Sequence, residues 1–431
     1  MKSKLRVFKF GGASVHDAEG VRRVGEIVKD NCDTPLVIVV SAMGKMTAAL
    51  EDVTSSYVTG SDRLQTQFAE VKEFHWKIAS DLFEAGHGVF GKINDLFVEI
   101  DWVLEEPPED TFEYLYDQIV SVGELISTHI VSAWLSDIGV SNTWLDVRDV
   151  LKTDNAHREA RIDWNWTEGL ISGRVPPMLR DNHAVVTQGF IGCTSENFTS
   201  TLGKEGSDYS AAVFANVLDA AEVVIWKDVE GVFSGDPKMF DHVSKLDRLS
   251  YREAIEMTYY GAKVIHPKTI KPLQNKSIPL FVRSFTHLNA QGTWIGTNLD
   301  SILPPIIVLA EDQALIHIST KDFSFVGEEH LSKLFGYFAT HRIKINLMRN
   351  TAISFSVCCR RSDRKIEGLR KDIENDFNVV VDFDLQLLTV RHSNEVTLDQ
   401  LLKGKTVVFE ERFKDTVQCV LKSSPTPTMK N

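Results

Sequence analysis

Short apolar runs and amphipathic stretches alternate along the first half of the chain. Residues 5–10 (LRVFKF) and 36–41 (LVIVVS) are rich in β-branched residues and flank a stretch with helical spacing over about 17–31. Strand, helix and strand in that order predict a β-α-β unit. Residues 48–136 lack strand-like alternation, so this segment is predicted to form several helices inserted between strands.

Strand patterns return after that insertion and again alternate with helical stretches. Further strands are predicted at 143–147, 184–190, 222–227 and 279–283, and further helices at about 207–219, 250–258 and 266–275. Several of these strands are almost entirely apolar, which is typical of a mostly parallel sheet covered by helices on both faces. The pattern therefore predicts an α/β fold of three layers built on an open sheet.

The pattern changes after residues 303–306 (LPPI). The order that follows is strand, helix, strand, strand, helix, strand, at 306–319, 329–341, 343–349, 352–360, 363–376 and 378–384. This is the ferredoxin-like βαββαβ arrangement. A second, shorter round is predicted at 386–392, 397–403, 405–412 and 416–422. The predicted domains are therefore 1–303, 304–384 and 385–431. The last is an incomplete module that lacks the closing helix and strand of a full unit and ends in a polar tail.

The composition is that of an ordinary folded protein. Hydrophobic residues make up 43% and charged residues 25% of the 431 residues, a length that suits two or three domains. The formal net charge of -13 excludes an overall basic field, so neither nucleic acid nor a membrane surface is an expected partner. A polyanionic ligand would need a local cluster of Lys and Arg.

Cysteine usage and the amino terminus bear on the location of the protein. The five cysteines show no CxxC spacing, and an odd count fits a reduced compartment better than a disulfide framework. The first residues (MKSKLRVFKFGG) are too interrupted for a signal peptide, and no apolar run approaches the ~20 residues of a membrane span. These observations predict a cytoplasmic protein without a membrane segment.

The end of the first predicted strand combines a lysine with paired glycines. Lys9 precedes Gly11 and Gly12, which lead directly into a helix. Glycines at such a turn let backbone N–H groups approach an anion, and the positive end of the helix and the lysine charge favour a phosphate there. The alternative, a tight turn that needs glycine for backbone reasons, has about equal weight for this motif alone.

A second glycine-rich segment resembles a phosphate-binding loop only in spacing. Residues 86–92 (GHGVFGK) fit GxxxxGK, but Ile93 stands where a P-loop needs Ser or Thr to hold magnesium. The preceding residues also have helical rather than strand character. We therefore expect Gly88 and Gly91 to interrupt a helix rather than to bind nucleotide.

The segment 189–238 is the most informative part of the chain. Residues 199–208 concentrate hydroxyl groups, glycines, one lysine and one carboxylate before an Ala-rich helix, which suits a bound anion. The alternative is that Ser207 and Asp208 simply cap that helix. Further on, Lys227 and Asp228 follow a buried strand, and open α/β sheets bind their ligands at the carboxyl ends of strands.

Six motifs in this order resemble the amino acid kinase superfamily and, within it, the aspartate kinases. They are KFGGAS, SAMGKMTAALE, SVGELIS, TSTLGKEGSDYSAA, WKDVEGVFSGDP and GAKVIHP. The small modules that follow resemble the paired ACT modules of that family, so the resemblance covers essentially the whole chain. It implies ATP-dependent phosphorylation of the L-aspartate side chain to 4-phospho-L-aspartate, the committing step toward lysine, threonine and methionine.

The resemblance also implies residue roles. It makes Lys9 and Asp208 catalytic, the former stabilising the transferred phosphoryl group and the latter orienting the lysines. The substrate-binding residues would be Ser41, Thr47, Glu124, Lys204 and Ser207, with Glu124 meeting the ammonium group of the substrate and Lys204 its α-carboxylate. The nucleotide-binding residues would be Lys9, Gly11, Gly12, Lys227, Asp228, Phe233, Lys238, Lys263 and Val264. Mg²⁺ would be held through the nucleotide phosphates, with no metal ligand assigned to the protein.

Several of these residues have simpler interpretations when taken singly. Glu124 fits a surface ion pair, Thr47 a helix cap, Lys263 a solvated charge and Phe233 a core position. The fit to the family is also imperfect, because this chain has Lys204, Glu205 and Gly206 where the family commonly has Arg, Gly and Gly. A lysine cannot form the bidentate fork of an arginine with a carboxylate.

Two other functions remain open at this point, and the assembly is an expectation. The chain could act on glutamate or N-acetylglutamate, or be a catalytically silent amino-acid sensor, although the regulatory modules and the retained Lys9 and Asp208 argue against these. A homodimer through the ACT-like modules is expected, because pairing covers an exposed sheet edge. A complete feedback site is not expected, because the second module is short. In addition, residues 347–354 (LMRNTAIS) replace the segment that contacts the effector in the family.

Overall fold

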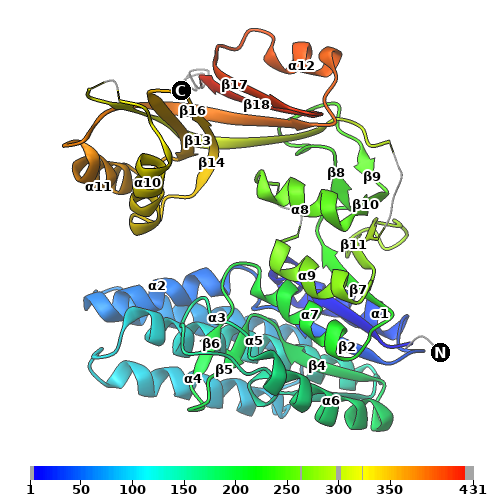
Figure 1. The fold of residues 1–431 in the computed structure, drawn as a ribbon. Coiled ribbons are helices and arrows are strands. Elements are labelled where there is room, and N and C mark those ends of the chain that lie inside the picture. Colours follow the sequence, from blue (N-terminus) through cyan, green and yellow to red (C-terminus); the bar gives the residue numbers. More distant parts are fainter. Residues whose placement is uncertain (1–3, 263–264, 298–301, 323, 423–431) are drawn as a thin grey trace, which may run out of the picture. The chain divides into compact units, whose positions relative to one another are not determined.

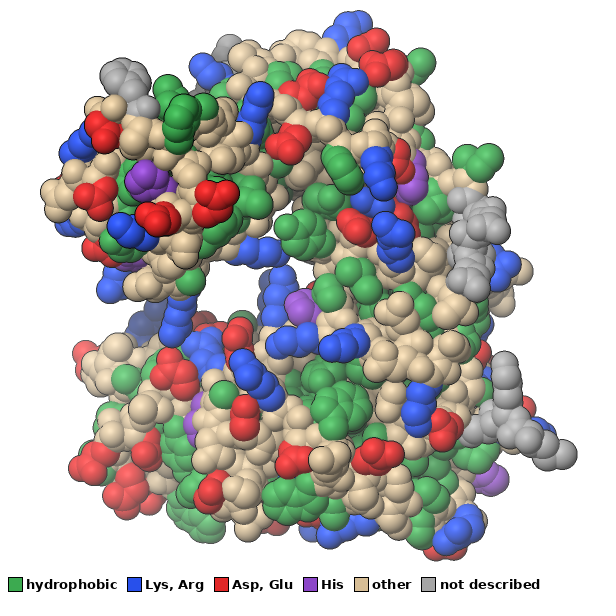
Figure 2. All heavy atoms as spheres, viewed as in Figure 1, with side chains coloured by type: hydrophobic (Ala, Val, Ile, Leu, Met, Phe, Trp, Pro, Cys, Tyr) green, Lys and Arg blue, Asp and Glu red, His purple; other side chains and the backbone are tan. Residues whose placement is uncertain are grey.

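The computed structural model describes residues 4–262, 265–297, 302–322 and 324–422. Its contacts divide the chain into two compact units. The first unit comprises residues 1–232, 245–255 and 264–299, and the second comprises residues 233–244, 256–263 and 300–431. Each unit is described by itself below. Charged side chains of both signs are interspersed over the face shown in Figure 2.

The first unit contains an eight-stranded sheet with the order β10-β12-β11-β7-β1-β2-β4-β3. Its strands are β1 (Arg6–Phe10), β2 (Leu36–Val40), β3 (Asn142–Leu145), β4 (Ala184–Gln188), β7 (Glu222–Lys227), β10 (Arg248–Ser250), β11 (Leu280–Ser284) and β12 (Thr293–Gly296). All neighbouring strands are parallel except β11 and β12. Strands β2 and β7, both apolar in sequence, flank the buried β1, as expected for a sheet with covered faces.

Helices cover both faces of this sheet, which confirms the predicted three layers (Figure 1). On one face lie α1 (Ala18–Lys29), α2 (Met46–Thr59), α3 (Leu64–Leu82), α4 (Val89–Glu105) and α5 (Phe112–Asp137). On the other lie α6 (Trp164–Asp181), α7 (Gly206–Val217) and α9 (Pro267–Asn275). Short elements complete the order: η1 (Gly12–Val15), η2 (Val147–Asp149), β5 (Ile191–Cys193), β6 (Thr199–Thr201), β8 (Val232–Phe233), β9 (Lys245–Leu246) and α8 (Tyr251–Tyr259).

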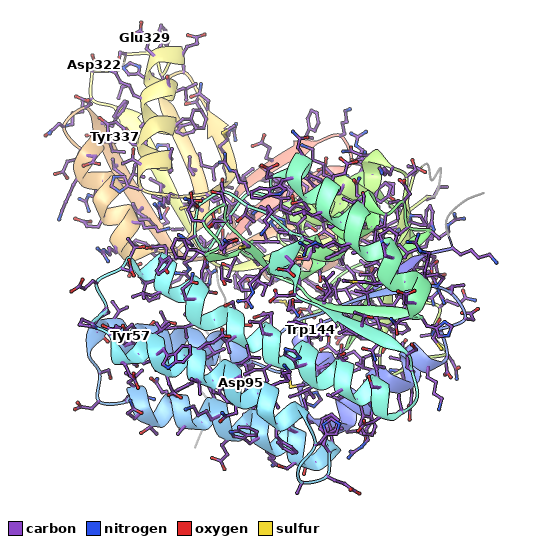
Figure 3. The ribbon with its side chains drawn as sticks, turned by 90° about the horizontal axis from the view of Figure 1, so that it is seen from below. Tyr57, Asp95, Trp144, Asp322, Glu329 and Tyr337 are labelled. Atoms are coloured by element: carbon purple, nitrogen blue, oxygen red, sulfur yellow. The ribbon has the colours of Figure 1, made fainter. Side chains whose placement is uncertain are left out.

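Helix α5 is the most deeply buried helix of the layer that it belongs to. It contacts β2, β3 and β4 on one side and α2 and α4 on the other, so its apolar side chains face protein all round. Trp144 of β3, labelled in Figure 3, donates a hydrogen bond from Nε1 to Thr128 Oγ1 (3.0 Å) and stacks on His129 of α5. By length and composition alone α5 could cross a membrane, but 72% of its most apolar window is buried inside the protein.

Helix α2 is anchored to the outer helices through Tyr57, also labelled in Figure 3. The Tyr57 hydroxyl lies 2.7 Å from the carbonyl oxygen of Val103 and 2.6 Å from that of Glu106, at the end of α4. Helix α4 itself begins with Gly88 as its N-cap and has Gly91 in its first turn. The segment 86–92 is therefore a helix start and not a strand–loop–helix phosphate site. Gly88 precedes the helix, as expected, but Gly91 lies inside it and does not break it.

One helix of this unit, α6, was not predicted from the sequence. Asp163 caps its first turn by accepting a hydrogen bond from the N–H of Trp166 (3.0 Å). Pro176 and Pro177 lie inside the helix, near its end. Proline removes a backbone donor and normally ends a helix, so these two residues masked a helical pattern whose buried face packs against β4 and α7.

The second unit contains a six-stranded antiparallel sheet with the order β14-β15-β13-β16-β18-β17. Its elements are β13 (Ile306–Thr320), α10 (Glu328–Thr340), β14 (Ile345–Asn350), β15 (Ser354–Arg360), α11 (Asp363–Ile373), β16 (Phe377–Arg391), α12 (Glu395–Leu402), β17 (Val407–Phe413) and β18 (Thr416–Lys422). The first βαββαβ round is confirmed. The strands predicted at 378–384 and 386–392 are instead one 15-residue strand, β16, whose residue 384 has a positive φ.

The shorter round is more complete than its sequence suggested. Residues 306–310 of β13 pair with 387–391 of β16, so β13 supplies the closing strand that we expected to be missing. The apolar cluster around Leu388 and Leu398 is completed by Phe240, from the 233–244 segment. The helix that a full module would place beside α12 is absent from the described residues up to 422, and Phe240 covers part of the apolar surface there.

Candidate active site

The predicted site residues of the first unit gather at one edge of its sheet. Strand β1 pairs in parallel with both β2 and β7, and β2 pairs with β4, so the carboxyl ends of all four strands lie together. After β1, the chain first adds β2, β3 and β4 on one side of β1 and later adds β7, β11, β12 and β10 on the other side. This reversal makes the carboxyl end of β1 a topological switch point. Ligands of open α/β sheets bind at such points.

Lys9 and Asp208 form a nearly buried ion pair at this edge. Lys9 Nζ lies 2.7 Å from Asp208 Oδ1, and their side chains are only 11% and 5% exposed. Burial opposes ionisation of Asp208, but the charges of Lys9 and Lys227 outweigh it and hold the pKa of that carboxyl below its usual value. The structure therefore assembles two cations around one ionised carboxylate in the first turn of α7.

The turn after β1 requires glycine for steric reasons. A Cβ on Gly12 would lie 2.5 Å from the carbonyl oxygen of Gly44 and 2.8 Å from that of Ala42. The Gly44 N–H also donates to the Gly12 carbonyl (3.0 Å), which joins the turn to the loop after β2. Gly11 is the N-cap of η1, and an added Cβ there would lie 3.3 Å from Lys9 Nζ. The turn is thus tightly packed at Gly12, and at Gly11 it lies directly beside the Lys9 ammonium group.

Glu124 lies in the protein interior and not in a surface ion pair. Its side chain belongs to α5 and is 2% exposed. The Ala42 N–H donates to Oε1 at 3.4 Å, whereas Oε2 accepts no hydrogen bond from the described residues. Burial raises the pKa of Glu124 to about 8 against the opposing effects of the Ala42 N–H and the Lys9 charge. A buried carboxylate with a spare oxygen suits an incoming cation.

The neighbouring hydroxyl residues are placed by the same elements. Ser41 follows β2, and its carbonyl oxygen accepts a hydrogen bond from Ser127 Oγ (2.7 Å). Thr47 is the second residue of α2 and is half-buried; the N-cap is Lys45, so Thr47 is not the cap that its sequence position also allowed. Ser207 is buried in the first turn of α7 beside Gly189.

Glu205, next to Lys204, links two helix starts. Its Oε2 accepts a hydrogen bond from the His266 N–H at 2.8 Å. Glu205 has a positive φ of 57° at the N-cap of α7, so it joins the start of α7 to the start of α9. Lys204 is exposed.

The predicted nucleotide residues are only partly placed. Lys227 is half-buried at the end of β7, and Asp228 next to it is exposed. Phe233 and Lys238 belong to the second unit, so their role stays a prediction. Lys263 and Val264 lie outside the described residues.

A buried network beside the site was missed from the sequence. Asp117 is fully buried in α5 and accepts hydrogen bonds from Thr201 Oγ1 (2.7 Å), His157 Nδ1 (2.8 Å) and the backbone N–H of Arg158 (3.2 Å). The signal was present, because Asp117 precedes Glu124 by seven residues and so lies on the same face of an otherwise apolar helix. The partners could not be predicted, since they come from distant parts of the chain.

Comparison with known proteins identifies the family. Residues 4–284 match the family model described as "Amino acid kinase family". The chain is 32% identical over 358 residues to lysine-sensitive aspartokinase 3 of Escherichia coli (strain K12), an alignment that covers 82% of this chain and 78% of that protein. The chain belongs to the aspartokinases of the amino acid kinase family. The predicted fold class and family are thus confirmed.

Two further comparisons describe the extent of this similarity. The crystal structure of E. coli aspartokinase III in complex with aspartate and ADP superposes with a TM-score of 0.84 at 26% identity, covering 97% of this aspartokinase-family chain and 96% of that one. A bifunctional aspartokinase/homoserine dehydrogenase of Daucus carota is 29% identical over 392 residues, and the chain spans 42% of its length.

Proposed function

We propose that this protein transfers the γ-phosphoryl group of ATP to the side-chain carboxylate of L-aspartate, giving 4-phospho-L-aspartate and ADP. The observation that carries the proposal is the Lys9–Asp208 ion pair beside the buried Glu124 at one sheet edge. The aspartate and ADP bound by the E. coli relative support the same pair of ligands here. The relatives are named aspartokinases, which favours aspartate over glutamate or N-acetylglutamate.

The arrangement fits the electrostatic problem of this reaction. An oxygen of the substrate carboxylate attacks the γ-phosphorus while the bond to the bridging oxygen of ADP breaks, so two anions must approach each other. Lys9 and Lys227 neutralise that charge, and Asp208 holds the lysines in position. Glu124 would accept the ammonium group of aspartate through its spare Oε2. This retained machinery argues against a silent sensor.

We also propose that Mg²⁺ enters with the nucleotide. The described residues contain no group of three or more His, Cys, Asp or Glu side chains placed to hold a metal ion. Lys9, Lys227 and the glycine N–H groups after β1 suit phosphate oxygens instead. The ion would then be held through the nucleotide phosphates and would supply positive charge that offsets theirs during transfer.

The assembly and location are further proposals. The sheet of the second unit ends in β14 and β17, and Val407, Val408 and Phe413 of β17 are exposed. An edge strand with exposed apolar residues favours pairing with a second copy, so we expect a homodimer through this sheet. All five cysteines are free, which supports a cytoplasmic location.

The reaction can be tested by trapping its product. Purified protein with Mg-ATP and hydroxylamine should form a hydroxamate when L-aspartate is added, because hydroxylamine attacks the acyl phosphate. Lys9→Ala protein is the control for contaminating kinases. Hydroxamate from glutamate alone, or from neither amino acid, would overturn the proposed function.

A further inference from the structure

Arg158 is held in place by the buried Asp117 network. Its backbone has a positive φ of 67°, which costs free energy for a residue other than glycine. The Arg158 N–H donates to both oxygens of Asp117 at 3.2 Å, and the neighbouring His157 also pairs with that carboxylate. The buried Asp117 carboxylate therefore holds the strained Arg158 backbone in place. The position of the Arg158 Cα, from which the side chain extends, is thereby defined.

The guanidinium group of Arg158 is restrained, but some of its N–H groups make no hydrogen bond within the described residues. Its carbon lies 4.2 Å from the ring centroid of Tyr116, and Nη2 lies 2.6 Å from Glu51 Oε1. Within the described part of the chain, Glu51 is the acceptor of its side-chain hydrogen bonds, so Nε and Nη1 keep N–H groups for another partner. The side chain is 35% exposed and can be reached by a ligand.

Two neighbours of Arg158 lie next to residues that are predicted to bind the substrate. Its partner Glu51 follows Thr47 by one turn of α2, and residues four apart share a helix face. On the other side, its carbonyl oxygen lies close to Gly203, the residue directly before Lys204: a Cβ added to Gly203 would meet that oxygen at 3.1 Å. Arg158 thus lies between the start of α2 and the turn that carries Lys204.

A third contact leads toward Glu124. Tyr116, on which Arg158 stacks, is buried, and its pKa is raised to about 12 by burial and by the charges of Glu51 and Glu124, against the opposing effect of Arg158. Tyr116 is therefore within electrostatic range of both Glu124 and Arg158. Three of the five residues predicted to bind the substrate amino acid, Thr47, Lys204 and Glu124, thus each lie near a direct neighbour of Arg158.

We propose that Arg158 binds the α-carboxylate of the substrate amino acid, together with Lys204. This inference rests on the proposed function and deepens it. Lys204 offers one ammonium group on an exposed side chain. Arg158 instead offers a planar guanidinium group, which can donate two parallel hydrogen bonds and is already restrained by stacking on Tyr116. Arg158 would thus supply the bidentate contact that the sequence lacks at position 204.

The inference predicts a loss confined to aspartate binding. Arg158→Gln should raise the KM for aspartate roughly 10- to 100-fold, the effect of losing a charged bidentate contact, with little change in the KM for ATP or in kcat. Arg161→Gln, an exposed residue of the same loop, is the matched control and should leave all three constants unchanged. Glu51→Gln should leave the KM for aspartate unchanged or lower it, because it removes a competing carboxylate.

A substrate analogue separates binding from a structural role. The α-amide of L-aspartate lacks the charged α-carboxylate, so its inhibition constant against aspartate should differ by less than threefold between wild type and Arg158→Gln. Equal losses for aspartate and the amide, or a raised KM in Glu51→Gln, would assign the arginine to structure and overturn the inference. An unchanged KM in Arg158→Gln would also overturn it. Wild-type protein without aspartate-dependent turnover would instead overturn the proposed function itself.

Discussion

Glu124 combines a binding role with a cost to folding. Its carboxyl ionises near pH 4.5 in an unfolded chain and near pH 8 in the native protein, because burial disfavours the charged form. The native state therefore binds more protons than the unfolded state between these pH values. It follows that the contribution of Glu124 to stability falls as the pH rises from about 4.5 to 8.

Replacing Glu124 with Gln should therefore stabilise the protein and weaken substrate binding. We expect a higher Tm than wild type at pH 8, with the difference shrinking toward pH 4.5, and a KM for aspartate raised about tenfold or more. Thermal melts across pH and initial rates measure these effects. Glu99→Gln is a control, because burial also raises the pKa of Glu99 but no site role is predicted for it. A KM that is unchanged in Glu124→Gln would remove Glu124 from the site.

The same pKa predicts how aspartate binding depends on pH. An ammonium group beside Glu124 stabilises its ionised form, so binding at pH 7 should release a proton and affinity should rise up to about pH 8. Calorimetry in buffers of different ionisation enthalpy measures the proton release. The proton release should be absent in Glu124→Gln, and its persistence there would point to another group.

Lys9 acts on the transferred group and should matter most in the transition state. Lys9→Ala is expected to lower kcat by roughly 10²-fold or more, with a smaller effect on the KM for aspartate. Lys92→Ala, which removes the lysine of the P-loop-like segment, should leave turnover normal because that lysine is exposed on α4. Near-normal kcat with a raised KM in Lys9→Ala would assign Lys9 to ground-state binding.

The positions of single site residues were predictable where a motif tied them to a particular element. Lys9, Asp208 and Glu124 were each tied to a strand end or helix, and the parallel sheet brings those ends together. Arg158 was not predictable, because its value depends on a positive φ and on stacking against a helix 40 residues earlier. Such features come from tertiary contacts that a local pattern does not encode.

The longer helices and strands followed the apolar pattern except where proline or continuity disguised it, and the short strands β10 and β12 were not predicted. The prolines of α6 concealed one helix, and β16 is one continuous strand where two were predicted. Close packing between elements was also hidden. Gly189, directly after β4, would place a Cβ 2.5 Å from the Cβ of Ser207 in the first turn of α7.

Gly189→Ala should therefore displace the start of α7 and with it Asp208. We expect kcat to fall about tenfold or more and the Tm to fall, since backbone must move to relieve the clash. Gly91→Ala is the matched variant, because nothing lies within 4 Å of its Cβ position inside α4. It should gain roughly 0.5–1 kcal/mol of stability with normal activity. Normal activity in Gly189→Ala would mean that α7 adapts without cost.

At the scale of the whole molecule, the sheet of the second unit predicts self-association through its edge strand β17. Light scattering should detect a dimer of the full chain, and Val408→Lys on the edge strand β17 should weaken it, because a charge on an edge opposes pairing. A dimer of unchanged strength would place the interface elsewhere. A cut near Leu303 is a poor alternative test, because it removes the residues that pack on Phe240.

Feedback should be weak despite the lysine sensitivity named for the E. coli relative. The reason is the missing second helix of the shorter module among the described residues, together with the unusual segment 347–354. Initial rates of the full chain should change little with millimolar lysine or threonine. Inhibition by either amino acid at micromolar concentration would contradict this expectation.

The position of Phe240 in the chain has a consequence for biosynthesis. The apolar partners of Phe240 include Leu388 of β16 and Leu398 of α12, which leave the ribosome about 150 residues later. At typical elongation rates this side chain waits roughly ten seconds or more with its apolar surface uncovered. We therefore expect nascent chains arrested before β18 to aggregate more readily than the complete chain, because Phe240 still lacks its apolar partners.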